Sequence, residues 1–321
     1  MDKILTVSIA AYNVADYIED TLESCIIDDM DSIEVLIVDD GATDNTPELA
    51  QKFVEKYPDT FKLIRKENGG YGTTINSGVE HATGKYFKLL DGDDYFDTDS
   101  LKKFIIRLKA ETSDMVLTKN LEISNENGEE ALPERGWYKY LESKMDISEM
   151  DSSILISMWN AAVKTELIKN NPYTYPKRYL YTDSLFVVNA LARSKTIAFY
   201  DLELYKYRVD RIGQSTSSES LLKHCEDMYQ VYLRVNEVYK KALSESNINK
   251  EILATHLAMT YLNYVSAGFM LNKKSADNKK RLIELEKECK KSQPEVYKLA
   301  AQMSKRVSLM RLTCYLSYYL N

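Results

Sequence analysis

The chain has 321 residues, of which 44% are hydrophobic and 28% charged, as in a globular protein with one large domain or two ordinary ones. A net charge of −7 disfavours general nucleic-acid binding, and a total of three histidines disfavours a His-rich metal site or a Ser-His-Asp hydrolase. Four scattered cysteines argue against a disulfide framework and a zinc ribbon, and the sequence lacks a run of about 18 apolar residues that would predict a membrane-spanning helix.

Strands alternate with helices through the first 120 residues. Helical spacing of apolar side chains predicts helices within residues 15–26, 44–58 and 100–110, and a Gly-rich turn at residue 68 leads into another. Because the intervening strands are apolar on both faces, we expect a mainly parallel sheet with helices on both sides. The expected strands cover residues 4–13, 33–41, 61–67, 85–94 and 114–120.

A different pattern begins at about residue 217. Strand-like runs end there, and long amphipathic segments follow, which predict helices. We therefore expect an α/β domain over residues 1–216 and a helical C-terminal region over residues 217–321. Within the first of these, residues 121–150 are more polar and predict a hairpin and a loop.

Polar residues collect where three of the expected strands end. They are AYN at 11–13, DDG at 39–41 and DGDD at 91–94. The carboxyl ends of strands line the ligand crevice of an open parallel sheet, so these groups should converge. Three close carboxylates repel one another, and a metal ion, a basic side chain or a solvated turn could relieve that repulsion. Carboxylate oxygens suit Mg²⁺ or Mn²⁺, and a diphosphate would complete the coordination of such an ion.

Four stretches of the chain carry a resemblance. They are SIAAYNVADYIEDTLESC, VLIVDDGATDNT, ENGGYGTTINSGVEHATGKYFKLLDGDDYF and YTDSLF, all within about residues 4–215. In order and spacing they resemble the motifs of family 2 glycosyltransferases, which are inverting enzymes of the GT-A fold. The resemblance implies transfer of a sugar from a nucleotide-diphosphate donor, such as a UDP-sugar, to a hydroxyl group. It also implies a saccharide or lipid-linked saccharide acceptor, in the synthesis of a surface polysaccharide.

The resemblance further implies roles for single residues. Asp91 and Asp93 would hold Mn²⁺ or Mg²⁺ with the diphosphate, and Asp183 would be the general base. Tyr12 would stack on the nucleotide base, an ordinary use of an aromatic face. The expected nucleotide contacts are Ala11, Tyr12, Asn13, Asp39, Asp40, Gly70 and Asp91. Further candidate contacts to donor or acceptor are Asn68, Gly69, Asp94 and Arg208.

Several alternatives stay open. A phosphatase of the haloacid dehalogenase type also ends a strand in Asp-x-Asp, but it normally has a small hydroxyl residue or Val where this chain has Tyr95. The chain could also be a sugar-nucleotide-binding module without catalysis. Asp183 could simply cap its helix. Two positions depart from the family pattern: residues 74–76 read Thr-Ile-Asn in place of Ala-Arg-Asn, and Thr182 stands in place of the usual Glu.

Charge is uneven along the chain. Residues 273–321 contain twelve Lys or Arg and five Asp or Glu, a net +7, which leaves −14 on the rest of a chain of net −7. Residues 305–321 combine Lys305, Arg306 and Arg311 with leucines and tyrosines, a pattern that suits a helix on an anionic membrane surface. A helix packed on its own domain or on a second copy fits as well. We expect a cytoplasmic protein, with peripheral contact to the inner face of the plasma membrane or homodimerisation through the C-terminal helices as the two options.

Overall fold

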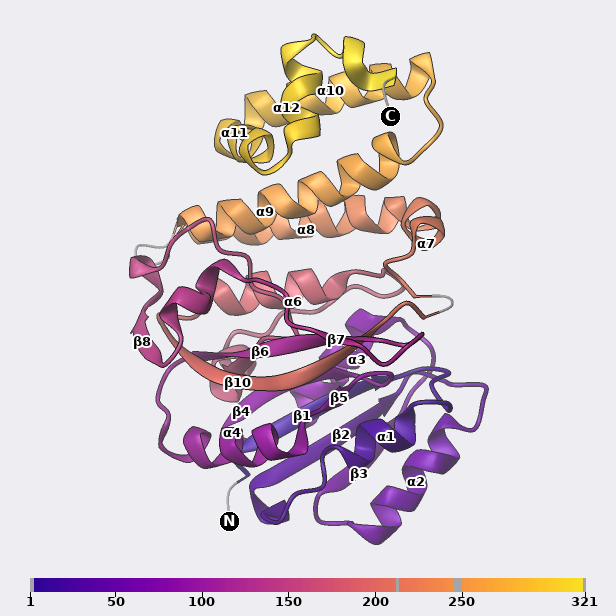
Figure 1. Ribbon diagram of the computed structural model, residues 1–321, viewed down its shortest axis with the longest axis vertical. Helices are drawn as coiled ribbons and strands as arrows, with labels where there is room; N and C mark the ends of the chain where they lie inside the picture. The colour runs from indigo at the N-terminus through magenta and orange to yellow at the C-terminus, as the bar shows by residue number, and fades with distance from the viewer. Residues whose placement is uncertain (1–2, 212–213, 245–249, 320–321) are drawn as a thin grey trace. The chain divides into compact units, whose positions relative to one another are not determined.

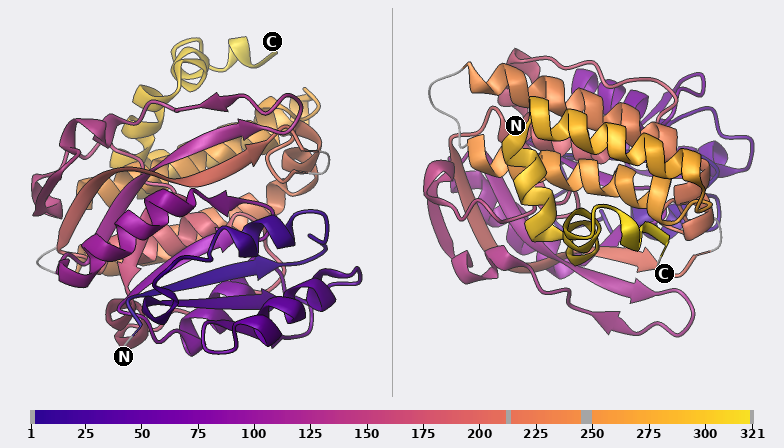
Figure 2. Two further views of the ribbon diagram at one scale, coloured as in Figure 1. Left: turned by 60° about the horizontal axis from the view of Figure 1, so that its bottom comes forward. Right: turned by 90° about the horizontal axis from the view of Figure 1, so that it is seen from above.

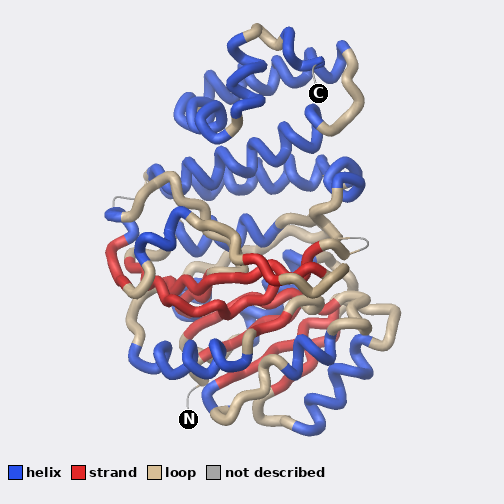
Figure 3. Tube along the Cα trace, viewed as in Figure 1, coloured by secondary structure: helices blue, strands red, loops and turns tan. Residues whose placement is uncertain are grey.

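The computed structural model describes residues 3–211, 214–244 and 250–319. The chain divides into two compact units, one made of residues 1–150 and 156–212, the other of residues 151–155 and 213–321. The described strands belong to the first unit, whereas the described residues after 213 form helices joined by short loops (Figure 3). The domain boundary expected after residue 216 stays a prediction.

Ten described strands form one mixed sheet in the first unit (Figure 1). They are β1 (Leu5–Ala11), β2 (Ile33–Asp39), β3 (Phe61–Arg65), β4 (Tyr86–Asp91), β5 (Tyr95–Phe96), β6 (Met115–Ser124), β7 (Glu130–Ala131), β8 (Ser143–Asp146), β9 (Ala161–Lys164) and β10 (Thr196–Val209). The order is β3-β2-β1-β4-β9-β6-β10-β5, with β7 beside β6 and β8 beside β10. The pairs β1–β2, β1–β4, β2–β3 and β6–β10 are parallel, and β9 lies antiparallel between β4 and β6. The expectation of a mainly parallel sheet is confirmed.

Helices cover both faces of this sheet. They are α1 (Ile18–Glu23), α2 (Thr46–Lys56), α3 (Tyr71–His81), α4 (Thr98–Ala110), α5 (Thr165–Asn170) and α6 (Thr182–Leu191), with short 3₁₀ turns η1 (Met30–Ser32), η2 (Gly136–Tyr140) and η3 (Ile147–Glu149). In Figure 1, α1, α2 and α4 lie on one face, and α3 and α6 on the other. This double cover buries every residue of β2 and nearly all of β1 and β4, which explains their continuous apolar sequences.

The register of the central strands aligns the ends that carry the polar residues. Ala11 of β1 lies opposite Asp39 of β2, and Ala10 lies opposite Asp91 of β4. After β4 the chain turns tightly across the end of β1, where the Gly92 N–H donates to the Ala10 carbonyl at 3.0 Å. A Cβ atom on residue 92 would lie 2.7 Å from that carbonyl oxygen, so the turn requires glycine.

The second half of the first unit contains two strands that the sequence did not predict, β9 and β10. In β10 the pairing with β6 shifts register between Tyr200 and Tyr205, which interrupts the two-residue alternation of a regular strand. The hairpin expected within residues 121–150 is present, because β6 continues to Ser124 and pairs with β7.

The described part of the second unit, apart from residues 151–155, is built from helices. They are α7 (Ser218–Lys223), α8 (Cys225–Leu243), α9 (Lys250–Val265), the π-helical η4 (Ser266–Met270), α10 (Ala276–Ser292), α11 (Pro294–Met303), α12 (Lys305–Leu312) and η5 (Leu316–Tyr319). Helix α9 packs against both α8 and α11 (Figure 2). The buried Glu286 of α10 accepts hydrogen bonds from Arg311 at 2.9 Å and Tyr315 at 3.1 Å, which ties the chain end to this unit. None of the helices within the described ranges combines the length and apolar character needed to cross a membrane.

Candidate active site

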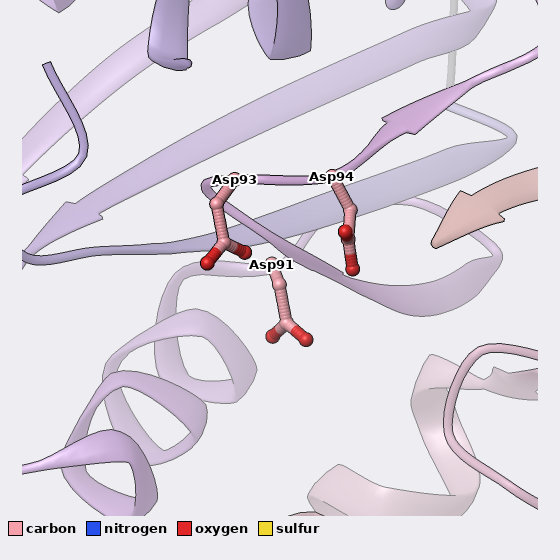
Figure 4. A group of neighbouring side chains, drawn as sticks. All are labelled: Asp91, Asp93 and Asp94. Atoms are coloured by element: carbon pink, nitrogen blue, oxygen red, sulfur yellow. The ribbon is translucent and has the colours of Figure 1, made fainter. Parts of the chain in front are cut away.

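Three carboxylates gather at the end of β4. Asp91, Asp93 and Asp94 each place a carboxylate oxygen within 4.8 Å of the others (Figure 4). Burial, followed by the charge of Asp93, raises the pKa of Asp91 to about 7. Burial and the two neighbouring charges also raise the pKa of Asp94 well above its ordinary value. Negative charge held this closely in a partly buried place favours the binding of a cation.

Two arginines from the end of β10 and the residues after it bring positive charge to this cluster. The Arg211 guanidinium pairs with the carboxylate of Asp93. Arg208 Nη1 donates to the Asp93 carbonyl at 2.7 Å, and its Nη2 donates to Asp20 at 2.9 Å. Of the three options left by the sequence, the solvated turn does not fit. A basic partner is present, and the carboxylates retain the chemistry of a metal site.

Asp94 has a structural task within the cluster. Its Oδ2 accepts from the Tyr205 hydroxyl at 2.8 Å, and its Oδ1 accepts from the Arg208 backbone N–H at 2.8 Å. Both oxygens therefore hold the turn against β10. Asp91 and Asp93 are the better-placed pair for a divalent ion, because hard carboxylate oxygens are the ligands that Mg²⁺ and Mn²⁺ prefer.

Two tyrosines that the sequence did not single out hold Asp91. The Tyr71 hydroxyl, at the start of α3, donates to Asp91 Oδ1 at 2.8 Å. The Tyr205 hydroxyl accepts from the Asp91 N–H at 3.2 Å. Burial raises the pKa of Tyr71 well above its ordinary value, and the charges of Asp91 and Asp183 add to this effect, so Tyr71 remains a donor. The Gly-Gly sequence before Tyr71 was the one sequence feature that could have pointed to a site residue there, and no sequence feature marked Tyr205.

The ends of β1 and β2 form a second polar group. Tyr12 follows β1 and is 47% exposed, so its ring face is accessible. Asn13 has a φ of 52° and accepts through Oδ1 from the Thr43 N–H at 2.8 Å, which joins the two loops. Asp39 is buried, accepts from the Ala42 N–H at 2.8 Å and pairs with Arg65 at 3.3 Å.

Asp40 organises the Gly-rich turn before α3. Its carboxylate pairs with Lys66, and it accepts from the Gly69 N–H at 3.0 Å and the Gly70 N–H at 2.7 Å. Gly70 has a φ of 82°, and a Cβ there would approach the Arg178 backbone to 3.2 Å, so glycine is required. With its carboxylate engaged by the turn, a contact of Asp40 with nucleotide stays a prediction. Asn68 is exposed beside it.

Asp183 lies in the first turn of α6. The N-cap of this helix is Tyr181, with a φ of 62° and no side-chain capping bond, so Asp183 is not the cap. Burial raises the pKa of Asp183, and backbone N–H groups of Ser184 and of Asp183 itself partly offset that rise. The charge of Asp183 adds to the rise in the pKa of Asp91, after burial and the charge of Asp93.

The two departures from the family pattern are buried. Ile75 is fully buried in α3, and Asn76 exchanges two hydrogen bonds with the Tyr175 backbone, at 2.9 and 2.8 Å. Thr182 is also fully buried. These positions therefore support the fold around the site.

Known proteins resemble this chain in sequence. The family model described as Glycosyl transferase family 2 matches residues 6–171. The putative glycosyltransferase EpsH of Bacillus subtilis is 24% identical over 289 residues, which cover 86% of this chain and 79% of EpsH. The poly(ribitol-phosphate) beta-N-acetylglucosaminyltransferase TarS of Staphylococcus aureus is 25% identical over 280 residues, which cover 85% of this chain but 47% of TarS.

Solved structures share the fold. The crystal structure of S. aureus TarS 1–349 in complex with UDP-GlcNAc has a TM-score of 0.71 at 21% identity, over 98% of this chain and 89% of that one. A mannosyltransferase from Pyrobaculum calidifontis, in complex with GDP-Man and Mn²⁺, has a TM-score of 0.54 at 18% identity, over 97% of this chain and 88% of that one. The GT-A fold is thereby confirmed. Since the family match spans more than half of the chain and includes the β1, β2 and β4 ends, this protein belongs to glycosyl transferase family 2.

Proposed function

We propose that the protein transfers a sugar from a UDP-sugar to a hydroxyl of a saccharide or lipid-linked saccharide, with inversion, in the synthesis of a surface polysaccharide. The observation that carries this proposal is the Asp91–Asp93 pair at the end of β4, which lies beside the ends of β1 and β2. The charge of Asp183 also acts on Asp91, where it raises the pKa. The TarS complex with UDP-GlcNAc supports a UDP-sugar as donor.

The nucleotide would occupy the ends of β1 and β2. Tyr12 offers an accessible ring to the base, and Asp39, whose carboxylate also accepts from the Ala42 N–H, would accept from a base N–H. Ala11 and Asn13 fix the loop beside them, and the Gly69–Gly70 turn lets the backbone come near the diphosphate.

Asp91 and Asp93 would hold Mn²⁺ or Mg²⁺, and the P. calidifontis mannosyltransferase, whose complex contains Mn²⁺, supports this assignment. A divalent ion supplies neutralisation of the charge that develops on a diphosphate leaving group. Tyr71 orients Asp91 through its hydrogen bond. Arg208 and Arg211 add fixed positive charge beside Asp93.

Asp183 would take the proton of the acceptor hydroxyl as that oxygen attacks the anomeric carbon. Burial raises its pKa, and a carboxylate with a raised pKa is a stronger base. Attack from the face opposite the leaving diphosphate inverts the anomeric centre in a single displacement, as in other inverting sugar transfers. The phosphatase alternative gains no support, because the family match assigns the chain elsewhere.

The test is Asp93→Ala. Wild type should hydrolyse UDP-GlcNAc or another UDP-sugar slowly with Mn²⁺ and lose that activity with a chelator. The variant should lose the activity and bind UDP no better with Mn²⁺ than without it, while melting near wild type because residue 93 lies in a turn outside the strands. Asp99→Ala, at an exposed position of α4, is the matched control. Metal-independent hydrolysis, or unchanged UDP affinity in the Asp93 variant, would contradict the proposal.

For the helical unit, peripheral contact with the inner face of the plasma membrane is part of the same proposal. Leu312 and Leu316 are 82% and 75% exposed. Lys279 lies 5.2 Å from the ring centroid of Tyr319, and burial, with the charge of Arg306, lowers the pKa of Lys274. Exposed leucines and several cations within one helical unit suit an anionic membrane surface.

Two members of the expected amphipathic tail have other tasks. Arg311 pairs with the buried Glu286, and Tyr318 is itself buried. The membrane-facing set is thus smaller than the sequence suggested. Homodimerisation through the same leucines is the competing outcome of the experiment described in the Discussion.

A further inference from the structure

Two aromatic rings stack on one another near the carboxylates, and the roles assigned above do not use them. Trp159, just before β9, and Tyr207, in β10, have ring centroids 4.2 Å apart and an interplanar angle of 25°. Both side chains are partly exposed. A tryptophan supported in this way presents a broad, flat, apolar surface to solvent or to a ligand.

The position of Tyr207 follows from its neighbour on the same strand. Residues 205 to 209 pair regularly with β6, so Tyr205 and Tyr207 point to the same face of the sheet. The Tyr205 hydroxyl contacts Asp94 and the backbone of Asp91. Two residues of a strand span about 6.6 Å, so Tyr207 lies that far beyond Tyr205, toward the C-terminal end of β10.

Trp159 reaches the same area from the other side. Its neighbour Met158 has Sδ 3.2 Å from the Tyr71 hydroxyl, which donates to Asp91. Tyr207 thus lies two residues from Tyr205, which contacts the carboxylates, and Trp159 lies next to Met158, which contacts the tyrosine that holds Asp91. The pair therefore borders the catalytic cluster.

The backbone of Trp159 is held firmly. Lys88, fully buried in β4, donates from Nζ to the Trp159 carbonyl at 2.7 Å. The next residue, Asn160, donates from Nδ2 to the Thr118 carbonyl at 2.9 Å and to Asn120 Oδ1 at 3.0 Å. A buried lysine engaged with backbone carbonyls is an expensive anchor, and it gives the ring the fixed position that a binding platform needs.

The order of strands separates this platform from the nucleotide side. Strands β2 and β1 lie on one side of β4, and β9 and β10 lie on the other. If the base and diphosphate occupy the ends of β2, β1 and β4, the stack lies beyond the sugar, where the acceptor must arrive. The apolar C–H face of a pyranose fits a flat indole, whereas an open-chain polyol phosphate offers neither a ring face nor an apolar surface.

We infer that Trp159, backed by Tyr207, is the platform on which a pyranose ring of the acceptor stacks, so that the acceptor is a ring-form saccharide rather than a polyol phosphate. This inference rests on the proposed function and specifies the acceptor class of the same site. Trp159 is a binding residue in this assignment, and Tyr207, Lys88 and Asn160 are positioning residues.

The first experiment reads Trp159 directly. The chain has two tryptophans, and the other, Trp137, is fully buried, so Trp137→Phe leaves Trp159 as the single tryptophan, whose emission is excited selectively at wavelengths that tyrosine does not absorb. The protein, saturated with UDP and Mn²⁺, is titrated with methyl glucoside, galactoside, N-acetylglucosaminide and mannoside, and separately with ribitol 5-phosphate. At least one pyranoside should shift or quench the emission, and ribitol phosphate should not. If Trp137→Phe does not fold, the difference between wild type and Trp159→Ala gives the same signal.

The second experiment measures transfer to the pyranoside that responds. Trp159→Ala should raise the KM for that acceptor on the order of tenfold, with a smaller change in kcat, and Trp159→Phe should recover most of the loss. Mn²⁺-dependent UDP binding and donor hydrolysis should stay at wild-type levels. Tyr12→Ala should do the opposite, weakening UDP binding and leaving the acceptor KM alone.

Three results would overturn the inference: no pyranoside perturbs Trp159, ribitol phosphate perturbs it as strongly, or Trp159→Ala keeps the acceptor KM. If wild type neither binds UDP nor hydrolyses a UDP-sugar, that result would instead count against the proposed function. The two failures are therefore distinguishable.

Discussion

Replacing Asp183 with Asn tests the centre of the proposed mechanism. The change keeps the shape of the side chain and removes its ability to take a proton. Because asparagine caps a helix about as well as aspartate, the helix-cap explanation of Asp183 predicts near-normal stability and normal turnover. The general-base explanation predicts lost turnover, and the capping position of α6 is already held by Tyr181.

The sizes of the two effects follow from the structure. Loss of a general base typically lowers the rate by roughly 10²–10⁴, which corresponds to about 2.7–5.4 kcal/mol in the activation barrier. Stability should move in the other direction. The pKa of Asp183 is raised in the folded protein, so the folded state binds a proton more tightly than the unfolded one, and stability falls as pH rises above the ordinary value of 3.8. At pH 7 the buried carboxylate therefore costs stability, and the asparagine variant should melt at or above wild type.

The assay combines transfer to the responding pyranoside, UDP binding with Mn²⁺ and thermal melting. Asp146→Asn is the matched control, because Asp146 is an exposed carboxylate that accepts from the Ser148 N–H at 2.9 Å in a short turn and lies outside the site. We expect Asp183→Asn to bind UDP normally and to lose transfer by at least about two orders of magnitude. Near-normal turnover, or a melting temperature several degrees below wild type with turnover retained, would refute the reasoning.

Two further predictions concern acid stability and the C-terminal helices. Burial tends to raise the pKa of Glu111, but hydrogen bonds from Tyr200, the Ser113 N–H and Lys144 bring this pKa down to about 2. The ionised Glu111 therefore stabilises the folded protein above pH 4.5, and that stabilisation is lost as pH falls from 4.5 toward 2. Glu111→Gln should be less stable than wild type at pH 7 and lose less on acidification over that range, and equal acid sensitivity of the two proteins would count against this. Changing Leu312 and Leu316 together to Asp should reduce co-sedimentation with vesicles that contain anionic lipid, with neutral vesicles as the control. If vesicle binding is unchanged but a dimer of wild type becomes a monomer, these leucines form a subunit interface.

The sequence by itself determined the first half of the fold and the carboxylates of the site. Strands β1, β2 and β4 are buried on both faces, so they appear as unbroken apolar runs, and the polar residues that end them stand out. The aspartates at positions 91 and 93 could be found for that reason, and their shared edge follows from the rules for parallel sheets. The resemblance to a known family then added Asp183, whose short motif has no such pattern of its own.

Only the tertiary structure decided which residues surround those carboxylates. Tyr205 and Arg211 come from more than a hundred positions after Asp91, and nothing in a local sequence marks a tyrosine or an arginine whose partner is so distant. Asp40 was predicted to contact nucleotide, which stays a prediction, and only the structure shows that its carboxylate also accepts from Gly69 and Gly70 and so holds a turn. The reason is physical: periodicity reports burial along one element, whereas this site is made by side chains from the end of β4, α3, α6 and β10 that meet only when the sheet has formed.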